Sequence, residues 1–409
     1  MKRHVATFLV LAGVLLLASC SAVNTGLDNA REENFSMFDG KAVGVVTNHT
    51  ALDRNGDHLV DLLDAAPDVA VAAIFAPEHG FRGDTEGGVH LENNIDPNTG
   101  APIFSIYGET RKPTPEMLEG IDALIFDIQD VGARFYTYIS TMGNIMEAGG
   151  ENGIPVYIMD RPNPIGRIAE GPVLEQDYKS FIGMYPIPIR HGMTVGELAL
   201  MIKDKGWVGS TEELDLHIVE VSGWNPQKSY RATGLKWVDP SPNMRNVNEA
   251  LVYPGMCLFE GTNFNEGRGT EHPFEWVGAA YIDGEKVAKA LRARNVPGVE
   301  IEAIEFVPVD MPGYAMNPKF EGETCGGLSF SVTDPTEFKA VELGVHLLHI
   351  LQTEYPDDFR MRERRFNITW GNDEAYNMLL DGKSAEAIIA TYRDELDQFV
   401  KIREQYLLY

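Results

Sequence analysis

A glutamate, a histidine and an arginine follow one another closely after an apolar stretch of the sequence. Residues 69–76, VAVAAIFA, contain no polar side chain, and Glu78, His79 and Arg82 come next on a glycine-rich stretch. A carboxyl group can exchange protons with a substrate, and an imidazole or a guanidinium can bind an anion. If 69–76 is a strand buried on both faces, these groups lie on a pliable loop at its carboxyl end. The alternative is a loop whose charges are only solvated.

Three further apolar stretches, 41–48, 121–130 and 154–161, also end in polar residues. In a parallel sheet the carboxyl ends of the strands share one edge, where α/β proteins bind their ligands. Any single polar end also has a structural explanation as a helix cap or a turn, and Asp160 is such a case. Together the ends predict a polar cleft. Its further candidate residues are Asn48, His49, Asp127, Gln129, Asp130, Arg134, Tyr136, Tyr138, Arg161 and Asn163.

Two carboxyl groups at such an edge could hydrolyse a glycosidic bond. One protonates the leaving oxygen, and the other acts as nucleophile, as base or as support for a participating group of the substrate. We expect Glu78 to be the acid, because burial would keep it protonated, although His79 and Arg82 would act in the opposite direction. Asp127 and Asp130 are the candidates for the second group. Adjacent strands would place Glu78 and Asp127 about 5 Å apart, and one strand further would make this about 10 Å.

Two more polar stretches lie outside these strand ends. Arg190 and His191 precede a helix predicted over 194–206, and a helix N-terminus favours anions. Residues 259–276 fit neither a helix nor a strand period and are predicted to form a loop. Ordinary solvated loop chemistry is the alternative for both. The candidates in the loop are Glu260, Asn263, Asn265, Glu266, Arg268, Thr270 and His272.

The elements that must position these residues alternate between strands and helices up to about residue 221. This alternation predicts an α/β, Rossmann-like and mostly parallel sheet with helices on both faces. No G-x-G-x-x-G follows the first strand and no Walker A sequence occurs, so we expect no nucleotide cofactor. The strands are predicted over 41–48, 69–76, 101–108, 121–130, 154–161 and 214–221, and the helices over 58–66, 114–120, 135–148 and 194–206.

In the second half of the chain the regular alternation of strands and helices gives way to a mixed pattern. Residues 224–254 are rich in Pro, Asn and Trp and are expected to form a loop or linker. We therefore predict a Rossmann-like catalytic domain over 36–235 and a smaller α+β domain over 236–409 that contributes to the cleft. In the second domain, helices are predicted over 284–295, 338–355 and 384–406, and strands over 299–310 and 326–334.

The beginning of the chain predicts export. Lys2 and Arg3 precede a short apolar stretch, and Leu17-Ala18-Ser19-Cys20 follows it. This is typical of a bacterial lipoprotein signal over 1–19, with Cys20 lipidated and residues 20–35 serving as a tether. The alternative is an ordinary signal peptide with an incidental cysteine. We expect a protein anchored to a bacterial membrane by its lipid, in the periplasm or at the outer membrane.

The charge of the chain limits its partners. It has 34 basic and 61 acidic residues, a net charge of −27. So acidic a surface is not suited to binding nucleic acid or an anionic membrane. An anionic substrate would need positive charge within the site. Cys257 and Cys325 could pair, but nothing requires it, and without a CxxC or HExxH motif a structural zinc site is not expected.

Several blocks of the sequence resemble one known family. They include NHTALDRNG, FAPEHGFRG, SIYGETRKPTPEML, DALIFDIQDVGARFYTYISTM, DRPNPIGRIAEGPVLE, PIPIRHGMTVGELA and NFNEGRGT. Over about residues 40–409 the chain is similar to the NamZ-type exo-β-N-acetylmuramidases, glycoside hydrolase family 171. The resemblance implies release of terminal N-acetylmuramic acid from the non-reducing end of peptidoglycan fragments, without a cofactor. It also implies that Glu78 is the catalytic glutamate.

This substrate would give roles to the other candidates. Its lactyl carboxylate could be received by Arg134, Arg161, Arg268 or His191. Its ring could stack on Tyr136, Tyr138 or Trp276. Its acetamido group could attack the anomeric carbon, with Asp127 or Asp130 orienting it. Further predicted contacts to the substrate are Asn48, His49, His79, Arg82, Asn163 and Glu266.

Two other functions fit the same residues. The first is a lipid-tethered carbohydrate-binding protein without turnover. The second is a metal-assisted hydrolase that uses His49, His79, Glu78 and Asp127. A serine hydrolase is disfavoured because no G-x-S-x-G elbow is present.

Overall fold

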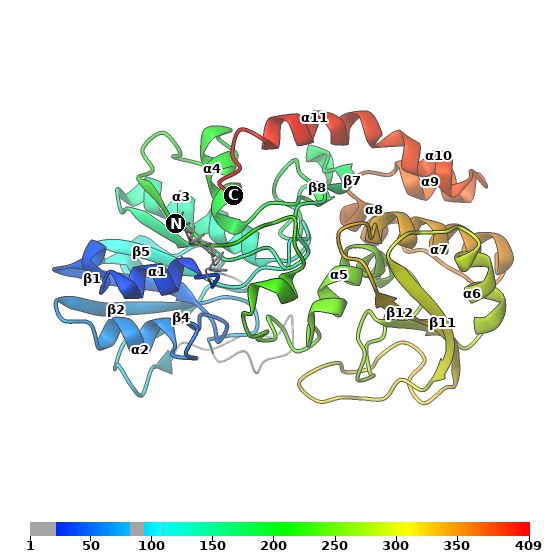
Figure 1. Cartoon of the computed structure of the whole chain (residues 1–409), viewed down its shortest axis with the longest axis horizontal. Helices are drawn as coiled ribbons and strands as arrows, with labels where there is room; N and C mark the ends of the chain where they lie inside the picture. The colour runs from blue at the N-terminus through cyan, green and yellow to red at the C-terminus, as the bar shows by residue number, and fades with distance from the viewer. Residues whose placement is uncertain (1–21, 82–93, 109) are drawn as a thin grey trace, which may run out of the picture.

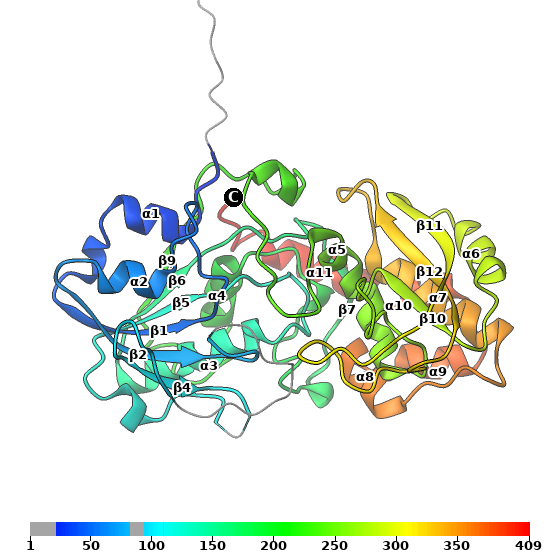
Figure 2. The same ribbon diagram turned by 90° about the horizontal axis from the view of Figure 1, so that it is seen from below.

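The structure is a computed structural model, and it describes residues 22–81, 94–108 and 110–409 (Figures 1 and 2). Two predicted residues, Cys20 and Arg82, lie outside this described part. The chain forms two domains, with the larger sheet in the first and a smaller one in the second.

The first domain is built on a seven-stranded sheet in the order β3-β4-β2-β1-β5-β6-β9. All neighbours pair in parallel except β3, which runs antiparallel to β4 at the edge. The six parallel strands follow the Rossmann order, with the switch point between β1 and β5. The predicted fold is confirmed. The strands are β1 (Lys41–Thr47), β2 (Val69–Ala76), β3 (Asn94–Ile95), β4 (Pro102–Ser105), β5 (Ala123–Asp127), β6 (Val156–Met159) and β9 (Leu216–Val219).

Helices cover both faces of this sheet, which explains its uniformly apolar strands. Along β5, Ala123 and Ile125 pack in the cluster of α1 and α2, whereas Leu124 and Phe126 pack in the cluster of α3 and α4. Successive side chains of a strand point to opposite faces, so every position of a doubly covered strand must be apolar. The four helices are α1 (Gly26–Glu32), α2 (Leu59–Asp64), α3 (Tyr138–Asn152) and α4 (Val195–Asp204).

The predicted tether over 20–35 is wrong for the residues that the structure describes. Helix α1 occupies part of this segment, and Thr25 and Asp28 form a capping box at its start. Leu27 and Ala30 are fully buried against the sheet, because their spacing places them on one helical face. The folded domain therefore begins before residue 36.

The second domain is α+β, as predicted. A three-stranded antiparallel sheet, β10-β12-β11, packs against helices. Helix α5 lies partly within the predicted linker, and the helix predicted over 384–406 is divided into α10 and α11. No helix in the described ranges is long and apolar enough to cross a bilayer. The elements are β10 (Trp276–Ala279), β11 (Val299–Phe306), β12 (Cys325–Val332), α5 (Val247–Met256), α6 (Gly284–Arg292), α7 (Ala340–Glu354), α8 (Glu363–Trp370), α9 (Glu374–Leu380), α10 (Ala385–Thr391) and α11 (Arg393–Arg403).

Short elements complete the fold. The strands β7 (Glu170–Val173) and β8 (Pro188–Arg190) form a two-stranded antiparallel ribbon. The helix predicted over 114–120 is a 3₁₀-helix, and Cys257 and Cys325 are buried free thiols. The 3₁₀-helices are η1 (Ser36–Phe38), η2 (Pro115–Leu118), η3 (Gln176–Tyr178), η4 (Tyr230–Thr233) and η5 (Cys257–Gly261).

The last residues return to the first domain, as Figure 1 shows for α11 and the C-terminus. Arg403 donates hydrogen bonds to the carbonyl groups of Arg167 and His191, at 2.8 and 3.1 Å. The hydroxyl of Tyr409 donates to Asp160 at 2.7 Å. The tail of the chain therefore packs on the domain in which the chain begins.

Arg134 connects the two domains from inside. It is only 1 % exposed. Its Nη1 donates to the carbonyl groups of Pro172 and Ile187, at 2.7 and 2.9 Å, and its Nη2 donates to those of Thr369 and Trp370 in α8, at 3.0 and 2.7 Å. Burial lowers its pKa to about 9. The prediction that Arg134 receives a substrate carboxylate is wrong, because backbone carbonyl groups occupy both of its terminal nitrogens.

We expect Arg134→Met to lower the free energy of unfolding by at least about 3 kcal/mol, because four buried carbonyl groups would lose their donors. Denaturant unfolding monitored by circular dichroism measures this change. Arg231→Met is the matched control, since Arg231 is exposed. Equal unfolding midpoints for the two variants would contradict the role assigned to Arg134.

Candidate functional site

A cavity of about 740 Å³ lies between the two domains. It contains seven of the predicted candidate residues, namely Glu78, His79, Tyr136, Tyr138, Glu260, Glu266 and Arg268. A cavity of this size accommodates a sugar and part of its neighbour. Its other polar lining residues are Tyr107, Arg111 and Thr137 from the first domain and Ser241, Asn243, Lys319, Arg362 and Arg365 from the second.

Glu78 follows β2 and is held by two hydroxyl groups. Its Oε1 accepts a hydrogen bond from the hydroxyl of Tyr107 at 2.7 Å, and its Oε2 accepts one from Thr137 Oγ1 at 2.6 Å. The side chain is partly buried, and no salt bridge joins it to a cation in the described part of the chain. The carboxyl group is therefore oriented by neutral donors at the wall of the cavity, where a general acid needs to be.

The turn after Glu78 is tightly constrained. His79 has a φ of 69° and Gly80 a φ of 77°, both in the left-handed region. This conformation is unfavourable for a non-glycine residue and persists only where the surrounding structure imposes it, often at functional sites. The strained turn places His79 on the cavity wall beside Glu78.

The second domain supplies a cationic wall. Arg268 and Arg365 each form a salt bridge with Glu260, at 2.8 and 2.7 Å, and Lys319 forms one with Glu266 at 2.6 Å. Burial alone would raise the pKa of Glu260, but Arg268 and Arg365 lower it to about 2. Glu260 is therefore a permanent anion that holds both guanidinium groups in place.

Positive charge exceeds negative charge in this cavity. Its described lining contains three arginines and one lysine from the second domain and Arg111 from the first, against the three carboxylates of Glu78, Glu260 and Glu266. The chain as a whole carries a net charge of −27. The cavity is thus the kind of local positive site that an anionic ligand requires in an acidic protein.

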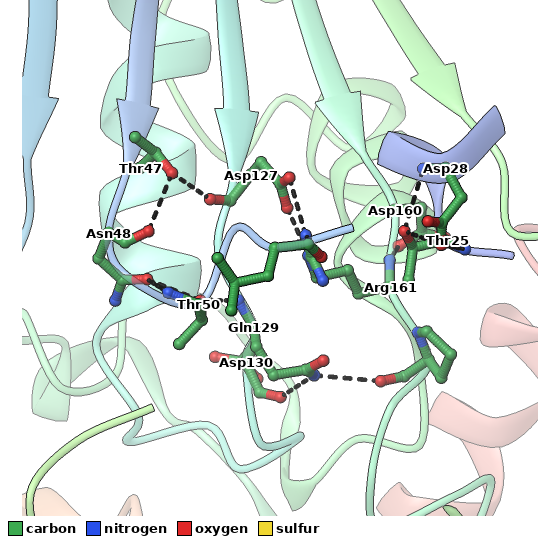
Figure 3. Close-up of polar contacts among 12 residues, drawn as sticks. Thr25, Asp28, Thr47, Asn48, Thr50, Asp127, Gln129, Asp130, Asp160 and Arg161 are labelled. Carbon is green, nitrogen blue, oxygen red and sulfur yellow. Dashed lines mark hydrogen bonds and ion pairs between the residues drawn. The ribbon is translucent and has the colours of Figure 1, made fainter. Parts of the chain in front are cut away.

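Asp127 is not part of this cavity. It is fully buried at the end of β5, and both of its oxygens accept hydrogen bonds from Arg161, at 2.5 and 2.9 Å (Figure 3). Strand β1 lies between β2 and β5, so Glu78 and Asp127 follow strands about 10 Å apart. The prediction that Asp127 is a catalytic partner of Glu78 is wrong, and so is the prediction that Arg161 receives a substrate carboxylate in this cavity.

Asp130 also lies outside the described lining of the cavity. One of its oxygens accepts a hydrogen bond from the backbone N–H of Gly132 at 2.7 Å, and the other has no partner in the described structure. Burial raises its pKa to about 7. Asp130 is therefore not placed in the described cavity with Glu78, contrary to its predicted catalytic role.

Three residues that are predicted to contact the substrate form hydrogen bonds within the protein instead. Asn48 donates to the hydroxyl of Tyr138 at 3.0 Å, and that hydroxyl donates to the carbonyl of Pro240 at 2.6 Å. Asn163 donates to the carbonyl of Met193 at 2.8 Å. These side chains are buried, so Asn48 and Asn163 are framework residues, and Tyr138 supports the cavity wall more than it presents a ring.

His49 and His191 are also predicted to bind the substrate, but His49 contacts a backbone carbonyl group and His191 is buried and uncharged. The Nε2 of His49 lies 2.7 Å from the carbonyl oxygen of Asp239. His191 is buried, and burial together with Arg403 lowers its pKa to about 3. His191 does not line the described cavity, so it is not placed to receive a substrate carboxylate there, contrary to the prediction. Trp276 stacks on His272 and does not line the cavity.

The residues of the metal-assisted alternative are dispersed in the same way. Within the described ranges, no three or more His, Cys, Asp or Glu side chains come close enough to hold a metal ion. Asp127 instead binds Arg161, as Figure 3 shows.

Several cavity residues are not predicted by the sequence. Tyr107 and Thr137 hold Glu78, and Arg365 and Lys319 complete the cationic wall. Thr137 stands between two predicted residues, Tyr136 and Tyr138, but a lone hydroxyl has no recognisable motif. Arg365 lies on α8, roughly 100 residues from its partner Glu260, so no local pattern connects them.

Comparisons with known proteins agree with this arrangement. Residues 43–248 match the family model described as exo-β-N-acetylmuramidase NamZ, N-terminal, and residues 251–409 match the corresponding C-terminal model. The chain is 42 % identical over 389 residues to the peptidoglycan β-N-acetylmuramidase NamZ of Bacillus subtilis (strain 168), covering 95 % of this chain and 91 % of that protein.

Two crystal structures of DUF1343 family proteins from Bacteroides fragilis NCTC 9343 are similar as well. They have TM-scores of 0.87 and 0.76 at 34 % and 35 % identity, and each comparison covers 95 % of this chain and 99 % of the other. The likeness thus extends over both domains. This chain therefore belongs to the NamZ exo-β-N-acetylmuramidase family.

Proposed function

We propose that this protein releases terminal N-acetylmuramic acid from the non-reducing end of peptidoglycan fragments, with Glu78 as the proton donor. The observation that carries this proposal is the position of Glu78, which two hydroxyl groups hold on a cavity with a cationic opposite wall. Membership of the family makes the protein a glycosidase that acts on peptidoglycan. Cell-wall turnover is the process in which such an activity is used.

The reaction begins when Glu78 donates its proton to the glycosidic oxygen as the bond to the anomeric carbon breaks. The other described carboxylates of the cavity, Glu260 and Glu266, are held by cations and are poorly placed to act as nucleophiles. This favours attack by the acetamido oxygen of the substrate itself. Water then opens the resulting ring, and Glu78 takes back a proton from that water.

The cationic wall supplies selectivity for muramic acid. A lactyl carboxylate distinguishes muramic acid from glucosamine, and guanidinium groups bind carboxylates through paired hydrogen bonds. Arg268 and Arg365 are oriented by Glu260 and line the cavity. We assign the recognition of the lactyl group to these two arginines.

Glu78→Gln tests the role of the acid. We expect at least about a 1,000-fold loss of kcat/KM on a natural muramyl disaccharide, because the amide cannot donate a catalytic proton. The loss should be much smaller on a 4-nitrophenyl glycoside, whose leaving group needs little protonation. Glu212→Gln, at an exposed site, is the control.

Equal losses on both substrates would remove Glu78 from the acid role. If the wild-type protein binds muropeptide glycans and releases no muramic acid, the carbohydrate-binding alternative is correct. Mass analysis of the products from defined glycans measures both outcomes and identifies the end from which the sugar is removed.

Arg268→Met and Arg365→Met test selectivity. Each should lower kcat/KM for an N-acetylmuramic acid glycoside by about 10- to 100-fold, the effect of one charge-assisted pair, and leave the slower reaction of the N-acetylglucosamine analogue little changed. Arg364→Met is the matched control on the same helix, because Arg364 is exposed and does not line the cavity. Parallel losses on both glycosides would contradict carboxylate recognition.

We also propose that the protein is anchored to a membrane through a lipid on Cys20, because a basic start and an apolar stretch precede Leu17-Ala18-Ser19-Cys20. In bacteria, Cys20→Ser should abolish incorporation of labelled palmitate and move the protein from the membrane to the soluble fraction. Ser21→Ala is the control. Unchanged fractionation of the Cys20 variant would rule out the lipid anchor.

A further inference from the structure

A second pocket lies at the switch point of the first sheet. Its volume is about 300 Å³, and it is lined from the ends of β1, β5 and β6 and from the segment around η4. Among the described residues, none lines both this pocket and the cavity of Glu78. One stretch of chain separates the two, since Lys236 and Val238 line the pocket whereas Ser241 and Asn243 line the cavity. Open α/β sheets typically bind ligands at this position.

The pocket contains a buried guanidinium with a free donor. Arg161 is 6 % exposed, and Figure 3 shows its side chain against Asp127. Its Nε and Nη2 donate to Asp127, and Nη2 also donates to the carbonyl of Leu52 at 3.2 Å. No residue in the described structure accepts a hydrogen bond from Nη1, and this nitrogen is not among the fully buried atoms. Nη1 is therefore open to the pocket and can donate a charge-assisted hydrogen bond to a ligand that offers an acceptor.

A tyrosine provides a second donor beside this group. Tyr230 is 6 % exposed and lines the same pocket, and its hydroxyl has no hydrogen-bond partner among the described residues. Burial raises its pKa to about 12, although Arg161 acts in the opposite direction. The hydroxyl therefore keeps its proton and can donate it to a ligand. Lys236, at the exposed rim, adds a third donor.

The carboxylates of the pocket are already satisfied by the chain. Asp28 accepts hydrogen bonds from the backbone N–H groups of Arg54 and Thr25, both at 2.8 Å. Asp53 accepts from the backbone of Asn55 at 2.9 Å and pairs with Arg31. The acidic groups are thus occupied, while Nη1 of Arg161 and the hydroxyl of Tyr230 have no partner among the described residues. This imbalance favours a ligand rich in acceptors over a cation.

We propose that this pocket binds a small sugar acid, a monosaccharide whose carboxylate accepts hydrogen bonds from Arg161 and Tyr230. A volume of about 300 Å³ suits a single sugar ring and is much larger than an inorganic anion needs. The Oε1 of Gln129, which has no donor in the described structure, takes a hydroxyl of the ring. The site is additional to the catalytic cavity and does not require turnover there.

The test uses ¹⁹F NMR of the full protein labelled with 5-fluorotryptophan. The chain has five tryptophans. Trp237 packs edge-on against Tyr230, with the ring centroids 5.7 Å apart, so its resonance reports on the pocket. Trp237→Phe assigns this resonance. Free N-acetylmuramic acid should shift it in a saturable way, and N-acetylglucosamine, which lacks the carboxylate, should need at least about tenfold higher concentration.

Two variants make the proposal falsifiable. Tyr230→Phe and Lys236→Gln should each weaken the apparent affinity at Trp237 by about fivefold or more. Arg268→Met, in the catalytic cavity, should leave that affinity unchanged. In the unliganded variants, unshifted resonances of the four tryptophans other than Trp237 verify that the proteins are folded.

Three results would overturn the proposal: no saturable shift of Trp237, equal affinity for the two sugars, or a shift that Arg268→Met abolishes and the pocket variants do not change. None of these measurements depends on hydrolysis. A failure here is therefore distinguishable from a failure of the proposed catalytic function.

Discussion

The site depends on how the two domains are held together, and a buried arginine provides much of that attachment. Arg134 donates to carbonyl groups of the first domain and of α8, and it has almost no exposure to solvent. Because each of these carbonyl groups would otherwise be unsatisfied in a dry interior, the arrangement tolerates little movement. Helix α8 also carries Arg365, so the same contact positions the cationic wall relative to Glu78.

The sheet has Rossmann topology, but a buried ion pair lies at the edge where such sheets usually bind their ligand. At the switch point, where a dinucleotide fold would present a glycine-rich turn, this protein has the buried pair of Asp127 and Arg161 (Figure 3). The cavity of Glu78 is displaced from that point toward β2 and is closed by the second domain. The candidate site therefore lies beside the switch point and not on it.

Several charged side chains of the cavity are held in place by salt bridges, and their balance differs from the net charge of the chain. Glu260 holds two arginines and Glu266 holds Lys319, so the cations of the cavity are fixed before a substrate arrives. Such preorganisation lowers the cost of orienting long, flexible side chains on binding. A strongly acidic protein can in this way maintain a cationic cavity.

The sequence by itself determined the parallel strands, the helices α2, α3 and α4 and the loop of Glu78, because apolar periodicity and glycine-rich turns are local signals. It did not predict α1, whose segment reads as a polar tether. It could not separate Glu78, beside the cavity, from Asp127, inside an ion pair, since both are acids at strand ends. Only the tertiary structure decided between them: strand order sets which ends are neighbours, and each charge finds its partner across the fold. Tyr107, Thr137 and Arg365 acquired their positions for the same reason, as contacts between distant segments leave no pattern in the sequence.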